Sequence, residues 1–381
     1  MLAVLAAPDR IRYRARMQKL LVVIVGVVAA VGLPIQAAMQ PSAKPAAPAF
    51  EADPAWPAVP NNWVLGDVSS IAVDAHDNVW ILHRPRNVPA DQRSKAAPAV
   101  IKFDRTGRFV TAWGGPAAGY DWPEREHGIY VDQDDAVWIS GNNGYGTPPP
   151  PGNSDDMLLK FTTAGKLLLQ IGHSGRSTGN ADTGNVRQAA DMFLYRPSNE
   201  LFVADGYGNH RVIVFDAKTG AFKRMWGAFG KTPQTPGPPQ RQADPLQAPQ
   251  FGLVHAIKVS NDGLVYVADR ANKRVQVFTV KGEYRQQVPI GADTAAAQTA
   301  AGLALSPDPA QRFLYVADLG NSLIEIFDRQ AMQPISSFGS SGNAPGQFAT
   351  LHHIAVDSRG NIYTAEINRN KRAQKFTLKP R

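Results

Sequence analysis

Three histidines stand at the same position in alternating units of an internal repeat. They are His127 in EHGIYVD, His255 in VHAIKVS and His352 in HHIAVDS. The matching position in the intervening units holds a small residue, namely Ser69, Ala190 or Ala301. If the units are arranged around an axis, alternate units lie about 120° apart and the three imidazoles meet at one point. Neutral imidazoles bind Zn²⁺ well, and three of them leave a fourth position open for water or substrate. The spacing therefore predicts a metal site.

Taken singly, each histidine is better explained as a strand cap or as a packed side chain with a satisfied hydrogen bond. The alternation favours a shared metal ion instead. His353 leaves the ligand of the last unit open, because adjacent strand residues face opposite ways. The register of Ile354 with Ile129 and Ile257 favours His352. The remaining histidines are expected in turns or supporting roles: His76, His83, His173 and His210.

The repeat itself consists of short apolar strands separated by turns rich in Asp, Asn and Gly. Its second strand carries an aromatic residue in each of six units: Trp80, Trp138, Phe202, Tyr266, Tyr315 and Tyr363. Short, regular strands with turn residues between them indicate β-structure, and radial repetition is typical of a propeller. We therefore expect an all-β, six-bladed β-propeller. The last unit stops at RAQKFTL without a fourth strand, so we expect an N-terminal strand near Asn62 to Leu65 to close the ring.

The N-terminal region differs from the repeats. Residues 20–33 are apolar, follow five basic residues and lead to Ala37, which is the pattern of a secretory signal peptide. We expect residues 1–37 to be a signal peptide cleaved near Ala37, with retention as a membrane anchor as the alternative. Residues 38–60, rich in Ala and Pro, are expected to form a linker, and residues 61–381 the propeller. Two Pro/Gly-rich insertions, 144–153 and 230–249, are expected to be loops.

Composition is that of an exported globular protein. Removing residues 1–37 lowers the formal net charge from +8 to +4, and the basic residues are scattered, so no nucleic-acid surface is expected. The chain has no cysteine, so packing and ring closure must stabilise it without disulfides. We expect a monomer in the periplasm or the extracellular space, with membrane contact only if the signal segment is retained.

Two further residues lie where a ligand at the metal could be contacted. Arg84 follows the second strand of the first unit, and its planar guanidinium suits a carboxylate. Tyr207 lies in the turn ADGYGNHR of the third unit, and a phenol beside a zinc ion and a guanidinium can accept a proton. A solvated loop arginine and a packing tyrosine are the alternatives. Asp205, Asp269 and Asp318 are expected to stabilise turns.

The repeats resemble the NHL class of six-bladed propellers. Within that class, five motifs in the same order resemble peptidyl-α-hydroxyglycine α-amidating lyase: HRP at 83–85, EHGI around His127, ADGYGNHRV around Tyr207, VHAI around His255 and LHHI around His352. The resemblance extends from about Trp63 to Leu378. It implies that His127, His255 and His352 bind zinc, that Arg84 and Tyr207 are catalytic, and that the substrate is a small molecule or peptide with a C-terminal α-hydroxyglycine-type group. Cleavage of its C–N bond would give an amide and glyoxylate.

The sequence also departs from the family pattern. The family has an Asp after its last zinc-binding histidine, which helps to hold a calcium ion at the ring centre, and here that position is His353. Calcium prefers oxygen ligands, so the carbonyls of Ile71 and Ile129 are the remaining candidates. The monooxygenase domain that makes the hydroxyglycine is absent from this sequence, so a partner enzyme or a different carbinolamide substrate is expected.

Two other functions remain as hypotheses. The first is a non-enzymatic propeller that binds a protein or a cell-envelope component. The second is a gluconolactonase-like hydrolase with calcium, which fits poorly because the axial positions carry histidine and small residues rather than Glu, Asp and Asn.

Overall fold

The computed structural model describes residues 46–144, 152–234 and 244–380. The predicted signal segment lies outside these ranges, as do residues 145–151 and 235–243 of the two Pro/Gly-rich insertions. In the described part of the chain, no helix has the length and apolar character that a membrane span requires.

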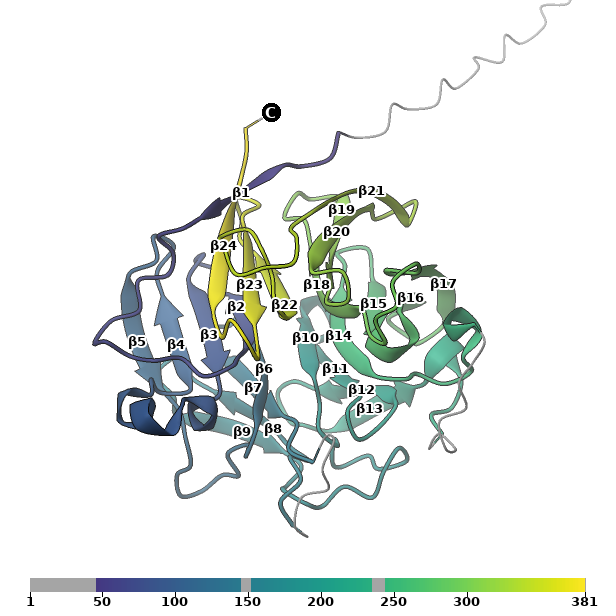
Figure 1. Cartoon of the computed structure of the whole chain (residues 1–381). Helices are drawn as coiled ribbons and strands as arrows, with labels where there is room; N and C mark the ends of the chain where they lie inside the picture. The colour runs from purple at the N-terminus through teal and green to yellow at the C-terminus, as the bar shows by residue number, and fades with distance from the viewer. Residues whose placement is uncertain (1–45, 145–151, 235–243, 381) are drawn as a thin grey trace, which may run out of the picture. The chain divides into compact units, whose positions relative to one another are not determined.

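Six four-stranded antiparallel sheets form the blades of a β-propeller, as the repeat predicts (Figure 1). Blade 1 contains β2 (Val68–Val73), β3 (Val79–His83), β4 (Val100–Phe103) and β5 (Phe109–Trp113). Blade 2 contains β6 (Glu126–Val131), β7 (Val137–Gly141), β8 (Leu158–Phe161) and β9 (Leu167–Ile171). Blade 3 contains β10 (Asp191–Tyr195), β11 (Glu200–Asp205), β12 (Arg211–Asp216) and β13 (Phe222–Trp226).

The second half of the ring repeats this order. Blade 4 contains β14 (Val254–Val259), β15 (Leu264–Asp269), β16 (Arg274–Thr279) and β17 (Tyr284–Pro289). Blade 5 contains β18 (Ala300–Leu305), β19 (Phe313–Asp318), β20 (Leu323–Asp328) and β21 (Gln333–Phe338). Blade 6 contains β22 (Leu351–Val356), β23 (Ile362–Glu366), β24 (Ala373–Leu378) and β1 (Phe50–Asp53). Short 3-10 helices occur in the connections, at Pro85–Asn87, Ala90–Lys95, Arg196–Ser198, Ala228–Gly230, Pro245–Gln247 and Arg270–Asn272.

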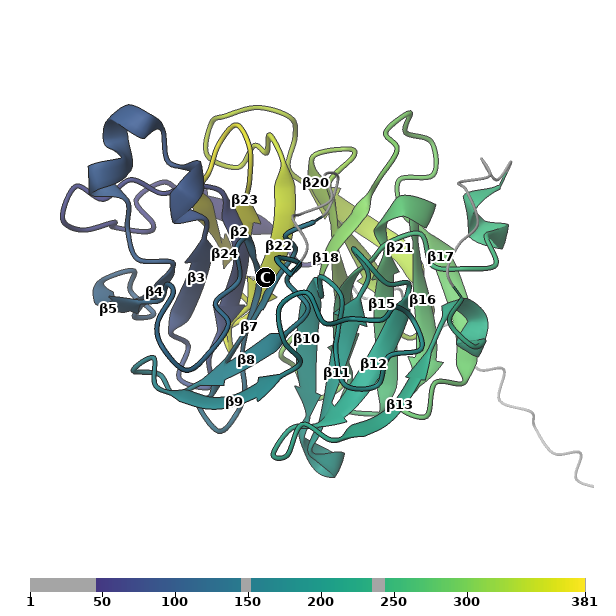
Figure 2. The ribbon, with the colours of Figure 1, turned by 90° about the horizontal axis from the view of Figure 1, so that it is seen from below.

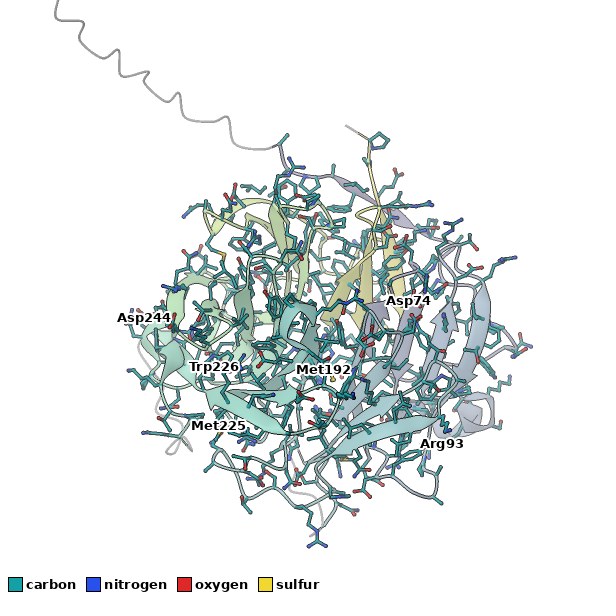
Figure 3. The ribbon with its side chains drawn as sticks, turned by 180° about the vertical axis from the view of Figure 1, so that it is seen from behind. Asp74, Arg93, Met192, Met225, Trp226 and Asp244 are labelled. Carbon is teal, nitrogen blue, oxygen red and sulfur yellow. The ribbon has the colours of Figure 1, made fainter. Side chains whose placement is uncertain are left out.

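The first strand of each blade lies at the axis and the fourth at the rim. Figure 2 shows this order in blade 1, from β2 near the middle to β5 outside. In Figure 3, Met192 of β10 lies near the centre, whereas Met225 and Trp226 of β13 lie further out. Inner strands of neighbouring blades contact each other around the ring, including β22 with β2. Six side-chain positions at the same height can therefore face one another across the axis.

Apolar side chains between the blades form the core. Six buried clusters are present, one between each pair of neighbouring blades. The second-strand aromatics that define the repeat lie on β3, β7, β11, β15, β19 and β23 and are buried. Trp80 and Trp138 each also donate a hydrogen bond to the turn aspartate of their own blade. One residue position thus serves both to fill the interface and to hold the turn.

Ring closure uses an N-terminal strand, but the predicted location was wrong. The closing strand is β1 (Phe50–Asp53), which pairs antiparallel with β24, Phe50 opposite Leu378. Phe50 stacks on Phe338 with 4.8 Å between ring centroids, which supplies the one apolar face that an edge strand needs. In the segment 62–65, Val64 makes only an isolated bridge to Ala96.

The segment 38–60 is also more than the expected linker. Its described part contains β1 and Trp56, which is 6% exposed. The Trp56 ring packs edge-on against Phe103 and Tyr363, between blades 1 and 6. The linker prediction relied on a composition rich in Ala and Pro and did not consider Phe50 and Trp56, whose rings attach this segment to the propeller.

Candidate metal centre

Each of the three histidines occupies the irregular position at the start of an inner strand. The pairing register shifts at His127 between Glu126 and Gly128, and the same shift occurs at His255 and at His352. Ser69 and Ala301 lie at the same bulge in blades 1 and 5. A β-bulge adds one residue to a strand and redirects its side chain. In these five blades the bulge thus turns one side chain out of the normal alternation. In blade 3, Ala190 directly precedes the inner strand β10.

The small residues of the odd-numbered blades orient the histidines through their carbonyl groups. Each histidine Nδ1 donates a hydrogen bond to the small residue of the next blade. These bonds are His127 to Ala190 at 2.9 Å, His255 to Ala301 at 2.5 Å and His352 to Ser69 at 2.6 Å. A carbonyl can only accept, so Nδ1 carries the hydrogen and Nε2 keeps its lone pair for a ligand.

Close packing between blades makes the first of these bonds possible. Gly128 follows His127, and a Cβ at Gly128 would lie 2.5 Å from the Ala190 carbonyl oxygen. A side chain at this position would push away the carbonyl that orients His127. Glycine is therefore required here for the close approach of two backbones.

The Nε2 atoms meet at the axis. Those of His255 and His352 are 3.2 Å apart, and His127, His255, His352 and His353 each place a ring nitrogen within 4.8 Å of the others. Nitrogen ligands about 2.0–2.1 Å from a tetrahedral Zn²⁺ ion lie about 3.3–3.4 Å from each other. Lone pairs that face each other at this distance repel unless a cation lies between them. The arrangement of the donors therefore fits a metal ion.

Burial keeps these imidazoles neutral. His127, His255 and His352 are at most 1% exposed. Removal from water is the largest cause that lowers their pKa values well below the ordinary value. Positive charge on Arg84 lowers the pKa of His127 further, and Arg270 does the same for His255. Neutral imidazole is the form that binds a metal.

His352, rather than His353, is the counterpart of His127 and His255. Its Nδ1 makes the equivalent interblade bond, and its Nε2 faces His255. His353 lies beside the cluster with its Nε2 buried and without a hydrogen-bond partner. Burial lowers the pKa of His353 to about 4.

Tyr207 lies directly at the histidine cluster. Its hydroxyl is 2.8 Å from His127 Nε2 and 3.0 Å from His255 Nε2. The turn that carries it is tightly packed, since a Cβ on Gly206 would lie 2.1 Å from the Val254 carbonyl oxygen beside His255. The close approach of this turn to blade 4 fixes the Tyr207 hydroxyl at the level of the histidine nitrogens along the propeller axis.

Arg84 is also buried near His127 and is 2% exposed. Its Nε donates to the Glu126 carbonyl at 2.8 Å, and its Nη1 lies 3.3 Å from the Asp67 carboxylate. The structure thus anchors the predicted arginine firmly in the wall of the site.

Arg270 was missed by the sequence reasoning. Its Nη1 donates to the Tyr207 hydroxyl at 3.1 Å, its guanidinium lies 5.3 Å from the centre of the Tyr207 ring, and its Nε is buried without a partner. A signal was available, because Arg270 directly follows the second strand of its blade, just as Arg84 follows β3. Comparing the unit ends would have found both arginines.

The remaining histidines have local roles. His83 accepts a hydrogen bond from the Gly66 amide and donates to backbone carbonyls, and burial lowers its pKa to about 4. His210 bonds the Phe251 carbonyl. His76 and His173 are exposed and lie near carboxylates.

Of the positions considered for calcium, the one held by His353 does not fit that ion. Ile71, Ile129 and His353 line one cavity on the axis, below the histidine cluster. The neutral imidazole of His353 supplies no hard oxygen ligand. The same cavity also contains the ammonium group of Lys258.

Fold and site together define a six-bladed propeller with a buried axial histidine cluster that can bind a metal ion.

An NHL repeat is matched at residues 251–278. The chain is 25% identical to human NHL repeat-containing protein 3, over 86% of this chain and 84% of that protein. It is 27% identical to peptidyl-alpha-hydroxyglycine alpha-amidating lyase 1 of Drosophila melanogaster, over 82% of this chain. It spans 57% of that lyase. A solved streptogramin B lyase structure superposes with a TM-score of 0.51 at 15% identity over 87% of this chain and 98% of the other, a likeness of fold alone. The NHL-repeat propeller and the resemblance to the amidating lyases are thus confirmed.

Proposed function

We propose that this protein is a zinc-dependent carbon–nitrogen lyase. Its substrate would be a small molecule or peptide with a C-terminal α-hydroxyglycine-type amide, and its products an amide and glyoxylate. Such a substrate is a carbinolamide, which breaks down when its hydroxyl group loses a proton and its C–N bond breaks.

The observation that carries this proposal is the orientation of three imidazoles from alternate blades. Their Nδ1 atoms are all bonded to carbonyls, and their Nε2 atoms face the axis. Three neutral nitrogen ligands with an open fourth position are typical of catalytic zinc. Bound zinc would act as a Lewis acid toward the substrate hydroxyl.

Tyr207 is placed to move the proton. Its oxygen lies within 3.0 Å of two ligand nitrogens, so a hydroxyl brought to the metal would lie beside the phenol. As the phenolate, Tyr207 would take the hydroxyl proton while the carbon–oxygen double bond forms. The electron pair of the C–N bond goes to the amide nitrogen, which then takes a proton. Arg270, which donates to the Tyr207 oxygen, would stabilise the phenolate.

Two buried guanidinium groups suit the carboxylate that becomes part of glyoxylate. Arg84 and Arg270 flank the histidine cluster and are at most 5% exposed. A buried guanidinium is costly when its N–H groups lack partners, and Arg84 has Asp67 whereas Arg270 Nε is buried without a hydrogen-bond partner. We infer that the substrate carboxylate is bound on the Arg270 side.

The comparisons support the same reaction class through the relatives named amidating lyase. The signal-like N-terminal sequence further supports an exported enzyme.

The test is to assay the purified protein for glyoxylate release from α-hydroxyhippurate and to measure its zinc content. We expect about one zinc ion per chain and equal amounts of benzamide and glyoxylate. Zinc-loaded protein that releases no glyoxylate would overturn the lyase assignment. Protein that holds no metal would instead favour a propeller that binds a macromolecular partner.

A further inference from the structure

The axial cavity below the histidine cluster contains a charged pair of its own. The cavity measures about 180 Å³ and is lined by residues from the inner strands of all six blades, so it lies on the propeller axis. Lys258 of β14 and Asp191 of β10 reach into it from neighbouring blades, and Lys258 Nζ is 2.7 Å from Asp191 Oδ2.

We propose that Lys258 is the resident cation of this propeller, so that its ammonium group takes the place of a structural metal ion at the ring centre. The ammonium donates to the Asp191 carboxylate and, at 2.9 Å, to the Ile257 carbonyl. It also lies 6.0 Å from the centre of the Phe193 ring. A carboxylate, a carbonyl and an aromatic face are all favourable partners for a cation.

Asp191 completes a link between two blades. Its Oδ2 accepts hydrogen bonds from the Ile257 amide at 3.0 Å and from Lys258. The Asp191 side chain thus joins β10 to β14 at the axis, which is what a central ion would do through its ligands. Its side chain is 3% exposed and that of Lys258 is 17% exposed, so water screens the pair little.

The repeat explains why a carboxylate lies at the ring centre. Asp191 follows Ala190, just as His353 follows His352, so the two residues hold the same repeat position in blades 3 and 6. These blades face each other across the axis. A carboxylate is therefore present at the ring centre, but it comes from blade 3 and faces a lysine.

Charge balance excludes a second cation. Among the side chains that line the cavity, Asp191 supplies the one carboxylate and Lys258 the one ammonium group, and the two are paired. A divalent ion added there would be repelled by the ammonium and would find its only carboxylate already paired. The wild-type protein should therefore be independent of calcium.

The experiment compares wild-type protein with Lys258→Met, Asp191→Asn and the double variant. Thermal melting is measured with and without millimolar calcium in buffer free of chelator, so that the histidine site is not stripped. Binding of radioactive calcium is measured by equilibrium dialysis. Lys223→Met, which removes a lysine from the exposed pair with Asp216, is the matched control.

We expect no calcium binding and no calcium-dependent shift in the wild-type protein. Lys258→Met leaves a buried carboxylate unpaired, so its melting temperature should fall by about 5–10 °C, and calcium should restore part of this loss. The double variant should have a higher melting temperature than Lys258→Met, and calcium should not change it. The control Lys223→Met should melt at the same temperature as the wild type. If Lys258→Met does not fold, the wild-type binding measurement still decides.

One bound calcium per wild-type chain, lost in Asp191→Asn, would overturn the proposal. So would a double variant whose loss of stability equals the sum of the two single losses, because additive losses would mean that the two charges do not interact. Neither result depends on the lyase reaction.

Discussion

Even-numbered and odd-numbered blades use the same repeat position, at the start of the inner strand, in different ways. In blades 2, 4 and 6 this position is a histidine that faces the axis. In blades 1, 3 and 5 it is Ser69, Ala190 or Ala301, whose carbonyl accepts the Nδ1 hydrogen of the preceding histidine. The difference shows that this histidine cluster depends on two kinds of blade, one that supplies the imidazoles and one whose carbonyls orient them.

The largest effect should follow the loss of a ligand from an even-numbered blade. His255→Ala removes one of three nitrogens and leaves two, which cannot hold a catalytic zinc tightly. We expect no retained zinc and no detectable glyoxylate release, measured by metal analysis and product assay. His76→Ala, which removes an exposed histidine, should behave as the wild type. Full activity in metal-free His255→Ala would end the metal-site hypothesis.

The next largest effect concerns the phenol supplied by an odd-numbered blade. Tyr207→Phe keeps the ring that packs near the arginine and removes only the oxygen beside His127 and His255. We expect zinc content to stay at the wild-type level while kcat falls by about 10²–10⁴-fold, the usual contribution of a general base. Unchanged kcat would remove Tyr207 from the mechanism.

An intermediate effect should follow a change in an orienting residue. Ala301→Leu places a large side chain in a fully buried position next to the carbonyl that holds His255. Loss of this outer hydrogen bond should weaken zinc affinity by about 10–100-fold, as measured by competition with a chelator. Ala301→Ser is the matched control, because blade 1 already carries Ser69 at this position. Equal affinities in both variants would mean that the odd-numbered blades do not orient the ligands.

The smallest effect distinguishes blade 5 from its neighbours. Asp205, Asp269 and Glu366 end their second strands paired with Arg211, Arg274 and Arg372. In blade 5, the residue paired with Asp318 at the matching position is Leu323 instead of an arginine. Burial, together with the charge of Asp318, raises the pKa of Glu325 to about 7.

A carboxyl whose pKa is higher in the folded state stabilises the fold below its unfolded pKa. This stabilisation is lost as the pH rises through the folded value, here between about pH 4.5 and pH 7. We expect wild-type protein to lose about 1 kcal/mol relative to Glu325→Gln over this range, after allowance for partial exposure. Urea unfolding of both proteins at pH 5 and pH 7.5 measures the difference. An equal change in the free energy of unfolding between pH 5 and pH 7.5 in both proteins would mean that water screens the repulsion between Glu325 and Asp318.

Much of the fold and part of the site could be predicted from residue spacing. The second-strand aromatics identified six blades, and the alternation of His127, His255 and His352 located the cluster, because a repeat converts sequence period into angle around the axis. The closing strand could not be located, since Phe50 pairs with Leu378 and Trp56 packs on Tyr363, each more than 250 residues away in sequence. Arg270 was missed because its role depends on Tyr207, in another blade.

The sequence by itself determined the number of blades, the alternation of histidine with small residues and the presence of Arg84 and Tyr207. These are local or periodic properties, which the chain carries in its order. Only the tertiary structure decided which nitrogen of each histidine is free, which N-terminal segment closes the ring, and that Lys258 meets Asp191 at the axis. Those facts depend on hydrogen bonds and ion pairs between blades, and their distances are set by how the blades pack rather than by sequence separation.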